Sequence, residues 1–247
     1  MFGWLRPWSP LDPEAKKWVE THLGWLAYEF GADVFLRRAL LLPTAEFFPA
    51  AFDGSDDSVQ EMYRQVCGYM DVDPADIPLE IYVEKRPIGL MNERGQQVME
   101  GAGGRYHGDR ITLNRDEIQT PTRLVGNLAH ELSHHKLMGE ERIDPRRYDN
   151  ELLTDLTAIF YGFGVFLTHG VYTWHSLNSF WPGTTLIRPE YMTEPMMCYA
   201  LAHRAWLLKE QRPAWSRHLS WSARASFRQS LHYLGKMNDS TFRAGTR

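Results

Sequence analysis

The stretch that decides the fold is NLAHELSHH, residues 127–135. Its histidines His130 and His134 are four residues apart, so on an α-helix they lie on one face about one turn from each other. Two imidazoles in this arrangement can bind one metal ion. Glu131 follows the first of them and can act as a general base toward a water on that metal. The spacing therefore predicts a metal site on a helix, and His135 points away from it.

A second helical pair follows at short range. Glu151 and Asp155 are also four residues apart and share a helix face. A catalytic zinc takes three protein ligands and keeps one open position, so a third ligand must join His130 and His134. Glu151 can supply it. Asp155 can accept the other ring N–H of one histidine, which fixes the tautomer of that ring.

Both helices have recognisable ends. Thr120 and Pro121 are typical of an N-cap and a first helical residue, and Gly139 stops the first helix after about 18 residues. Apolar residues recur every four positions along it and give it a face for burial. Asn150 or Asp149 can cap the second helix. The metal pattern thus lies within well-framed helices.

The pattern H-E-x-x-H followed by E-x-x-x-D resembles the gluzincin zinc metallopeptidases, which are the thermolysin-like enzymes and the minigluzincins. The resemblance covers roughly residues 103–170, under a third of the chain. It implies one zinc ion (Zn2+) per chain on His130, His134 and Glu151. It also implies hydrolysis of peptide bonds in a peptide or protein substrate, by a water that Glu131 activates.

The resemblance implies two further features. Gluzincins add a Tyr or His that stabilises the oxyanion; the candidates are Tyr148, Tyr199 and His169, and the residues His175, Tyr191 and His203 also qualify. Zincins pair extended substrate with an edge strand above the metal. We expect that strand within residues 103–107, on Gly103, Gly104, Arg105 and Tyr106, or within residues 110–113. A plain hairpin with a flexible tip is the alternative.

The fold class we expect is α+β and predominantly helical, with a small mixed sheet, a two-helix metal site and flanking terminal helices. The predicted sections are an N-terminal helical section (1–75) packed on the rest, a zincin-like metal-binding core (76–170), a C-terminal helical section (171–235) and a frayed tail (236–247). Outside the metal helices we predict helices at about 13–30, 59–70, 189–209 and 214–233, and strands at about 79–83 and 110–114.

The composition limits the binding partners and the cellular location that we expect. The 247 residues are 43% hydrophobic and carry a net charge of −4, which gives no electrostatic reason to expect nucleic acid. Cys67 and Cys198 make no disulfide framework, so we expect reduced thiols and a cytoplasmic location. We expect no signal peptide. Residues 156–174 are apolar over about the thickness of a bilayer, but their Gly, Thr and His content predicts a core helix and no membrane contact.

Two other functions stay open from the sequence alone. The chain can be a non-catalytic, zinc-stabilised module that binds a protein, or a zinc hydrolase of a non-peptide substrate. Glu131 argues against the first, because a structural site has no use for a base.

Overall fold

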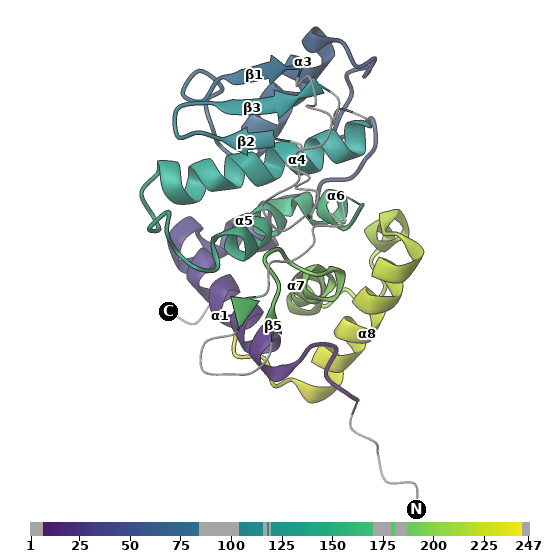
Figure 1. Cartoon of the computed structure of the whole chain (residues 1–247). Coiled ribbons are helices and arrows are strands. Elements are labelled where there is room, and N and C mark those ends of the chain that lie inside the picture. Colours follow the sequence, from purple (N-terminus) through teal and green to yellow (C-terminus); the bar gives the residue numbers. More distant parts are fainter. Residues whose placement is uncertain are drawn as a thin grey trace, which may run out of the picture.

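The described part of the protein is mostly helical and contains a three-stranded sheet and a short antiparallel strand pair (Figure 1). This computed structural model describes residues 7–83, 104–115, 118, 120–169, 179–180 and 187–243. The predicted α+β, predominantly helical class is confirmed. The helices are α1 (Pro13–Phe30), α2 (Ala32–Leu36), α3 (Asp56–Tyr69), α4 (Pro121–His134), α5 (Asn150–Ala158), α6 (Gly164–His169), α7 (Glu194–Leu207) and α8 (Trp221–Met237). The strands are β1 (Leu79–Tyr82), β2 (Gly104–Tyr106), β3 (Ile111–Asn114), β4 (Ser179–Phe180) and β5 (Ile187–Arg188).

The three-stranded sheet has the order β1-β3-β2, so β2 is an edge strand of the described sheet. β1 runs parallel to β3, and β2 runs antiparallel to it with Arg105 opposite Thr112. The backbone N–H of His107 donates to the carbonyl of Arg110 at 2.9 Å. Because hydrogen-bonded pairs alternate in an antiparallel ladder, Arg105 also bonds to β3. The backbone groups of Gly104 and Tyr106 therefore face the outer edge.

The helices form layers beneath this sheet (Figure 1). α3 packs on β1 and α4, and α4 passes directly under β2. On its other side α4 packs on α5 and α6, and these lie between α4 and the group formed by α1, α7 and α8. The helices of the N-terminal section thus pack on different parts of the protein. The two metal-motif helices, α4 and α5, are neighbours in the middle of the stack.

Side-chain caps are present at the starts of α1 and α4. The side chain of Asp12 accepts from the backbone N–H of Glu14 and Ala15, at 3.1 and 2.9 Å, and so caps α1. Thr120 caps α4 by accepting from the N–H of Arg123 at 3.3 Å. Beyond His134 the helix continues as a wider π-helical turn, His135–Gly139, before it ends. Side-chain oxygens at these positions satisfy N–H groups that a helix leaves unpaired.

The helical run from Asn150 to His169 is long and apolar enough to span a membrane, and 94% of its most apolar window is buried inside the protein. It is not one straight helix. Gly162 has φ +101°, and a π-helical segment, Ile159–Phe163, separates α5 from α6 there. The Gly162 carbonyl accepts from the N–H of Leu41 at 3.0 Å, and a Cβ would lie 2.9 Å from the carbonyl oxygen of Ala39. Glycine is required for this approach.

Two C-terminal helices differ from their predicted limits. α7 begins at Glu194 rather than near 189, because Pro195 belongs in a first helical turn. The predicted helix 214–233 is two elements: a 3₁₀ turn, Ala214–His218, and then α8. The hydroxyl of Ser220 accepts from the N–H of Ala223 at 3.1 Å and starts α8 after the break. The serine cap outweighs the continuous apolar pattern.

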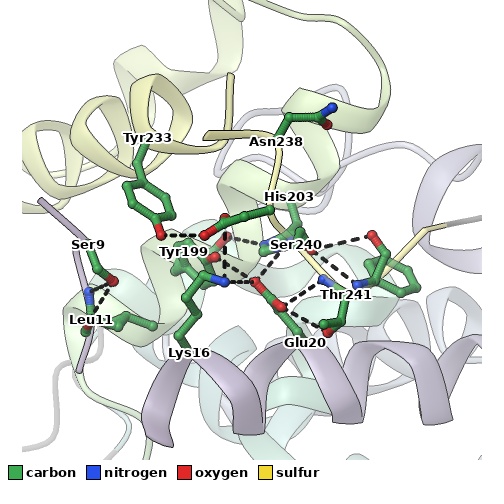
Figure 2. A network of polar contacts seen from close by, with 12 residues as sticks. Ser9, Leu11, Lys16, Glu20, Tyr199, His203, Tyr233, Asn238, Ser240 and Thr241 are labelled. Atoms are coloured by element: carbon green, nitrogen blue, oxygen red, sulfur yellow. Dashed lines mark hydrogen bonds and ion pairs between the residues drawn. The ribbon is translucent and has the colours of Figure 1, made fainter. Parts of the chain in front are cut away.

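The tail predicted to fray from residue 236 is instead packed as far as it is described. Ser240 and Phe242 are buried. Thr241 donates to Glu20 Oε2 from its backbone N–H and from its hydroxyl, each at 2.8 Å, as Figure 2 shows. The position is fixed by a partner more than 200 residues earlier, which no local signal announces. Residues 244–247 lie outside the described part.

Candidate metal centre

The three predicted ligands come together between α4 and α5. One ligand atom from each of His130, His134 and Glu151 lies within 4.8 Å of the other two. The Oε2 atom of Glu151 is 3.2 Å from Nε2 of His130 and 3.4 Å from Nε2 of His134. Both histidines are buried, and the Glu151 side chain is 28% exposed. The group is close enough to hold one metal ion, and its carboxylate side chain is partly exposed.

Asp155 fixes the tautomer of the first ring. Its Oδ1 atom lies 2.9 Å from Nδ1 of His130, and the residue is completely buried. An ionised carboxylate can only accept, so Nδ1 of His130 carries the hydrogen. This leaves the lone pair of the neutral ring on Nε2, which faces Glu151. The predicted contact between Asp155 and a histidine ring is present.

Thr154 fixes the tautomer of the second ring, that of His134. This role was not predicted from the sequence. Its hydroxyl donates to the carbonyl of Asn150 at 2.9 Å, so it has no second hydrogen for the ring of His134. Nδ1 of His134 lies 3.2 Å from this hydroxyl and must therefore be the donor. The lone pair of His134 is again on Nε2. A hydroxyl residue directly before Asp155 is the only signal in the sequence, and threonine is too common for that signal to stand out.

The donor set fits a cation. Two Nε2 lone pairs and a carboxylate oxygen converge, and such acceptors repel one another unless a proton or a metal ion lies among them. Burial alone lowers the pKa of His130, but hydrogen bonds with Asp155 and Glu151 outweigh it and raise that pKa well above 6.5. Burial raises the pKa of Glu151, but hydrogen bonds with His130 and His134 lower it overall. The site attracts positive charge, and two imidazoles with one carboxylate are ligands typical of catalytic zinc.

Glu131 lies beside this group, beneath the edge strand. Glu131 is buried, with 7% of its surface exposed. A Cβ on Gly104 would lie 3.0 Å from Cγ of Glu131 and 3.4 Å from its Oε1. A side chain on β2 at that position would displace the carboxylate, so glycine allows strand and base to approach each other. Three of the predicted edge-strand residues, Gly104, Arg105 and Tyr106, form β2; Gly103 lies outside the described residues.

Two tyrosines flank the group. The ring of Tyr106 on β2 is nearly parallel to that of His134, with centroids 6.3 Å apart. The ring of Tyr191 lies 5.9 Å from that of His130. Burial, and then the charge of Glu151 among others, raises the pKa of Tyr191 far above its ordinary value of 10, so its hydroxyl stays protonated.

A buried hydrogen bond fixes the segment that carries Tyr191. The backbone N–H of Met192, the next residue, donates to Oδ2 of Asp155 at 2.9 Å. Asp155 therefore uses one oxygen for His130 and the other for this segment.

The predicted oxyanion residues have other surroundings. The hydroxyl of Tyr199 donates to Glu20 at 2.8 Å, in the buried cluster of Figure 2. The ring of His169 lies 2.6 Å from the carbonyl of His218. Tyr148 is 57% exposed. Of the other residues that qualified, Tyr191 lies beside the metal group and His203 lies in the Glu20 cluster, while His175 lies outside the described residues.

No protein-family model, no curated protein and no solved structure matches this chain. The geometry of the site is therefore the basis for its function.

Proposed function

We propose that this protein is a zinc-dependent metallopeptidase of the gluzincin type. The observation that carries the proposal is the convergence of two histidine Nε2 lone pairs and a Glu151 oxygen within 4.8 Å, with a buried glutamate, Glu131, next to them. The locked tautomers of His130 and His134 add to this support, because rings held in this way are ready to bind a metal ion.

His130, His134 and Glu151 would hold the ion. Zinc bound there would supply a Lewis acid that polarises the scissile carbonyl and lowers the pKa of a water to about 7. Glu131 accepts a proton from the attacking water and delivers it to the leaving amine. Its buried place beneath Gly104 keeps the carboxylate out of bulk solvent and limits its movement.

A peptide substrate is favoured by the orientation of β2. The backbone groups of Gly104 and Tyr106 face the outer edge of the strand, above the helix that carries Glu131. An extended peptide can add to such an edge by main-chain hydrogen bonds, whatever its side chains are. The spacing of these two residues matches the alternate backbone groups of one strand.

Tyr191 is the residue we assign to oxyanion stabilisation, in place of Tyr148, Tyr199 and His169. It lies against His130 and keeps its proton, so its hydroxyl can donate to negative charge that develops on a carbonyl oxygen. The bond between Met192 and Asp155 holds this segment in register with the metal group.

The test is metal analysis combined with peptide hydrolysis. The purified protein should contain about one zinc per chain, and His130→Ala should remove it. Glu131→Gln should keep the zinc and lower hydrolysis of a peptide library by about 10²–10⁴-fold. Tyr191→Phe should also keep the zinc and lower kcat by about 10²-fold.

The same measurements separate this proposal from a non-catalytic zinc module. If Glu131→Gln retains zinc and the wild-type protein cleaves no peptide in the library, the catalytic proposal fails. Hydrolysis of esters or other non-peptide substrates without peptide cleavage would instead favour a zinc hydrolase of another class.

A further inference from the structure

The helix that carries Glu151 starts without a side-chain cap. Asp149 occupies the N-cap position of α5, yet its carboxylate makes no hydrogen bond to the first turn. An aspartate at this position ordinarily accepts a backbone N–H and so stabilises the helix start. Glu151 belongs to that uncapped first turn, and helix ends fray most easily. The position of Glu151 must therefore be fixed by contacts other than a helix cap.

The carboxylate of Asp149 is turned toward α1 instead. It is completely buried, and its Oδ2 accepts from the indole N–H of Trp18 at 2.7 Å. The guanidinium of Arg147 donates to both oxygens, from Nε at 2.5 Å and from Nη2 at 3.2 Å. Asp149, which directly precedes α5, is thus bonded to a helix more than 100 residues earlier in the sequence.

His22 holds Arg147 from the same face of α1. Its Nδ1 donates to the carbonyl of Trp18 at 2.8 Å, so Nε2 accepts from Nη2 of Arg147, 2.6 Å away. The ring lies on the indole of Trp18, with centroids 4.3 Å apart. Both groups that contact Asp149 are therefore ordered by α1.

α1 is itself anchored on its opposite side. Lys16 and Glu20 lie about 200° around the helix from Trp18 and His22. Glu20 accepts from Thr241 and from Tyr199 of α7, as Figure 2 shows. The helix is a fixed support held between the C-terminal segment and the start of α5.

We propose that Trp18 and Arg147 are positioning residues for the metal ligand Glu151. By holding Asp149 they fix the first turn of α5 where the Glu151 carboxylate meets Nε2 of His130 and His134. A turn that is already ordered loses less conformational entropy when the metal binds, so the affinity is higher. This inference depends on the proposed metal site.

The experiment compares two tryptophans in the full-length protein. Trp18→Phe keeps an aromatic ring and removes the N–H donor. Trp215→Phe is the matched control, because its N–H donates to the carboxylate of Glu210 at 3.1 Å in another part of the protein. Zinc affinity is measured by competition with a chelator, coordination by the absorption spectrum of the Co²⁺ form, and stability by thermal unfolding of the metal-free form.

Trp18→Phe should weaken zinc binding by about 10-fold and alter the Co²⁺ bands, since residues behind metal ligands have effects of this size. Trp215→Phe should stay within about twofold of the wild type, with an unchanged spectrum. Should Trp18→Phe not fold, Arg147→Lys serves the same purpose. Asp149→Asn keeps an acceptor for Trp18 and should lose less affinity than Asp149→Ala.

Two failures are distinguishable. If the wild type binds zinc and Trp18→Phe matches it in affinity and in Co²⁺ spectrum, the positioning role is overturned and the metal site stands. If the wild type binds neither ion, both proposals are overturned together.

Discussion

Two glutamates in this protein, the buried Glu20 and the partly exposed Glu151, lie beside histidines and differ in what faces their oxygens. Glu20, in the cluster of Figure 2, receives hydrogens from Thr241, Tyr199 and Lys16. Glu151 faces two ring nitrogens whose partner nitrogens already carry the hydrogens. The first carboxylate is satisfied by the protein alone. The second is satisfied only when a proton or a cation lies between it and the rings.

The histidines show the same contrast. His203, in the Glu20 cluster, has its pKa lowered to about 4, chiefly by burial, so the ring stays neutral. His130 is also buried, yet its two carboxylate partners raise its pKa. Residue types alone would not separate these clusters. The number of hydrogens that point at each carboxylate does separate them, and it agrees with the proposed role of Glu151 as a metal ligand and with a structural role for Glu20.

The strongest test of this contrast makes the same substitution in both clusters. Glu151→Gln should weaken zinc binding more than about 100-fold, because an amide is a poor metal ligand. Glu20→Gln should leave zinc affinity within about threefold and lower the free energy of unfolding by about 2–4 kcal/mol, since it leaves Lys16 without its buried partner. Chelator competition and urea unfolding measure the two effects. If Glu20→Gln weakened zinc binding and Glu151→Gln mainly lowered the free energy of unfolding, the roles given to the two glutamates would be contradicted.

A second test concerns the ring of His134. Thr154→Val keeps the shape of the buried side chain and removes the acceptor for Nδ1, so zinc affinity should fall by about 10–100-fold. Thr154→Ser should restore most of it. Thr157→Val is the control, because this buried hydroxyl donates only to the carbonyl of Leu153. Equal losses for the two valine variants would show a packing effect rather than a hydrogen bond.

A third test uses pH. The pKa of His130 is raised, so its protonated ring stabilises the metal-free fold below pH 6.5, and this contribution is lost as pH rises through the higher folded value. Zinc needs the ring deprotonated, so zinc affinity should increase with pH over that range, by up to about tenfold per unit. The difference between the unfolding temperatures of the zinc-bound and zinc-free protein should grow as pH rises above about 6.5. A constant gap would argue against zinc on His130.

The smallest effect should come from Gly104→Ala. The new methyl group would lie 3.0 Å from Cγ of Glu131 and shift the carboxylate by a few tenths of an ångström. Peptide hydrolysis should fall by up to about 10-fold, with zinc content unchanged. Gly68→Ala is the control, because a Cβ there meets no atom within 4 Å. An unchanged hydrolysis rate for Gly104→Ala would argue against a close approach of the Glu131 carboxylate to β2.

Local patterns were enough to predict the metal group. His130, His134, Glu151 and Asp155 stand at helical spacing, and Thr120 and Pro121 start the first helix, so few long-range contacts were needed. α4 and α5 are also close in sequence, which limits how they can pack.

What the sequence did not reveal depends on distant contacts. Tyr191 was one of several residues that qualified, but no periodicity placed it at the site, where a backbone bond from Met192 to Asp155 helps to hold its segment. The C-terminal tail has a polar composition that is typical of fraying, but a carboxylate on α1 orders it. Asp149 looked like a helix cap and bonds to Trp18 instead.

The two oxygens of Asp155 carry a consequence for redesign of this site. One meets the ring N–H of His130 and the other meets the backbone N–H of Met192. Asparagine offers a single acceptor, so whichever donor it serves, its own NH₂ group confronts the other. Glutamate is one methylene longer, and Asp155 is completely buried. The orientation of the His130 ring and the position of the Met192 loop therefore both depend on the Asp155 side chain. A substitution of Asp155 cannot change one without changing the other.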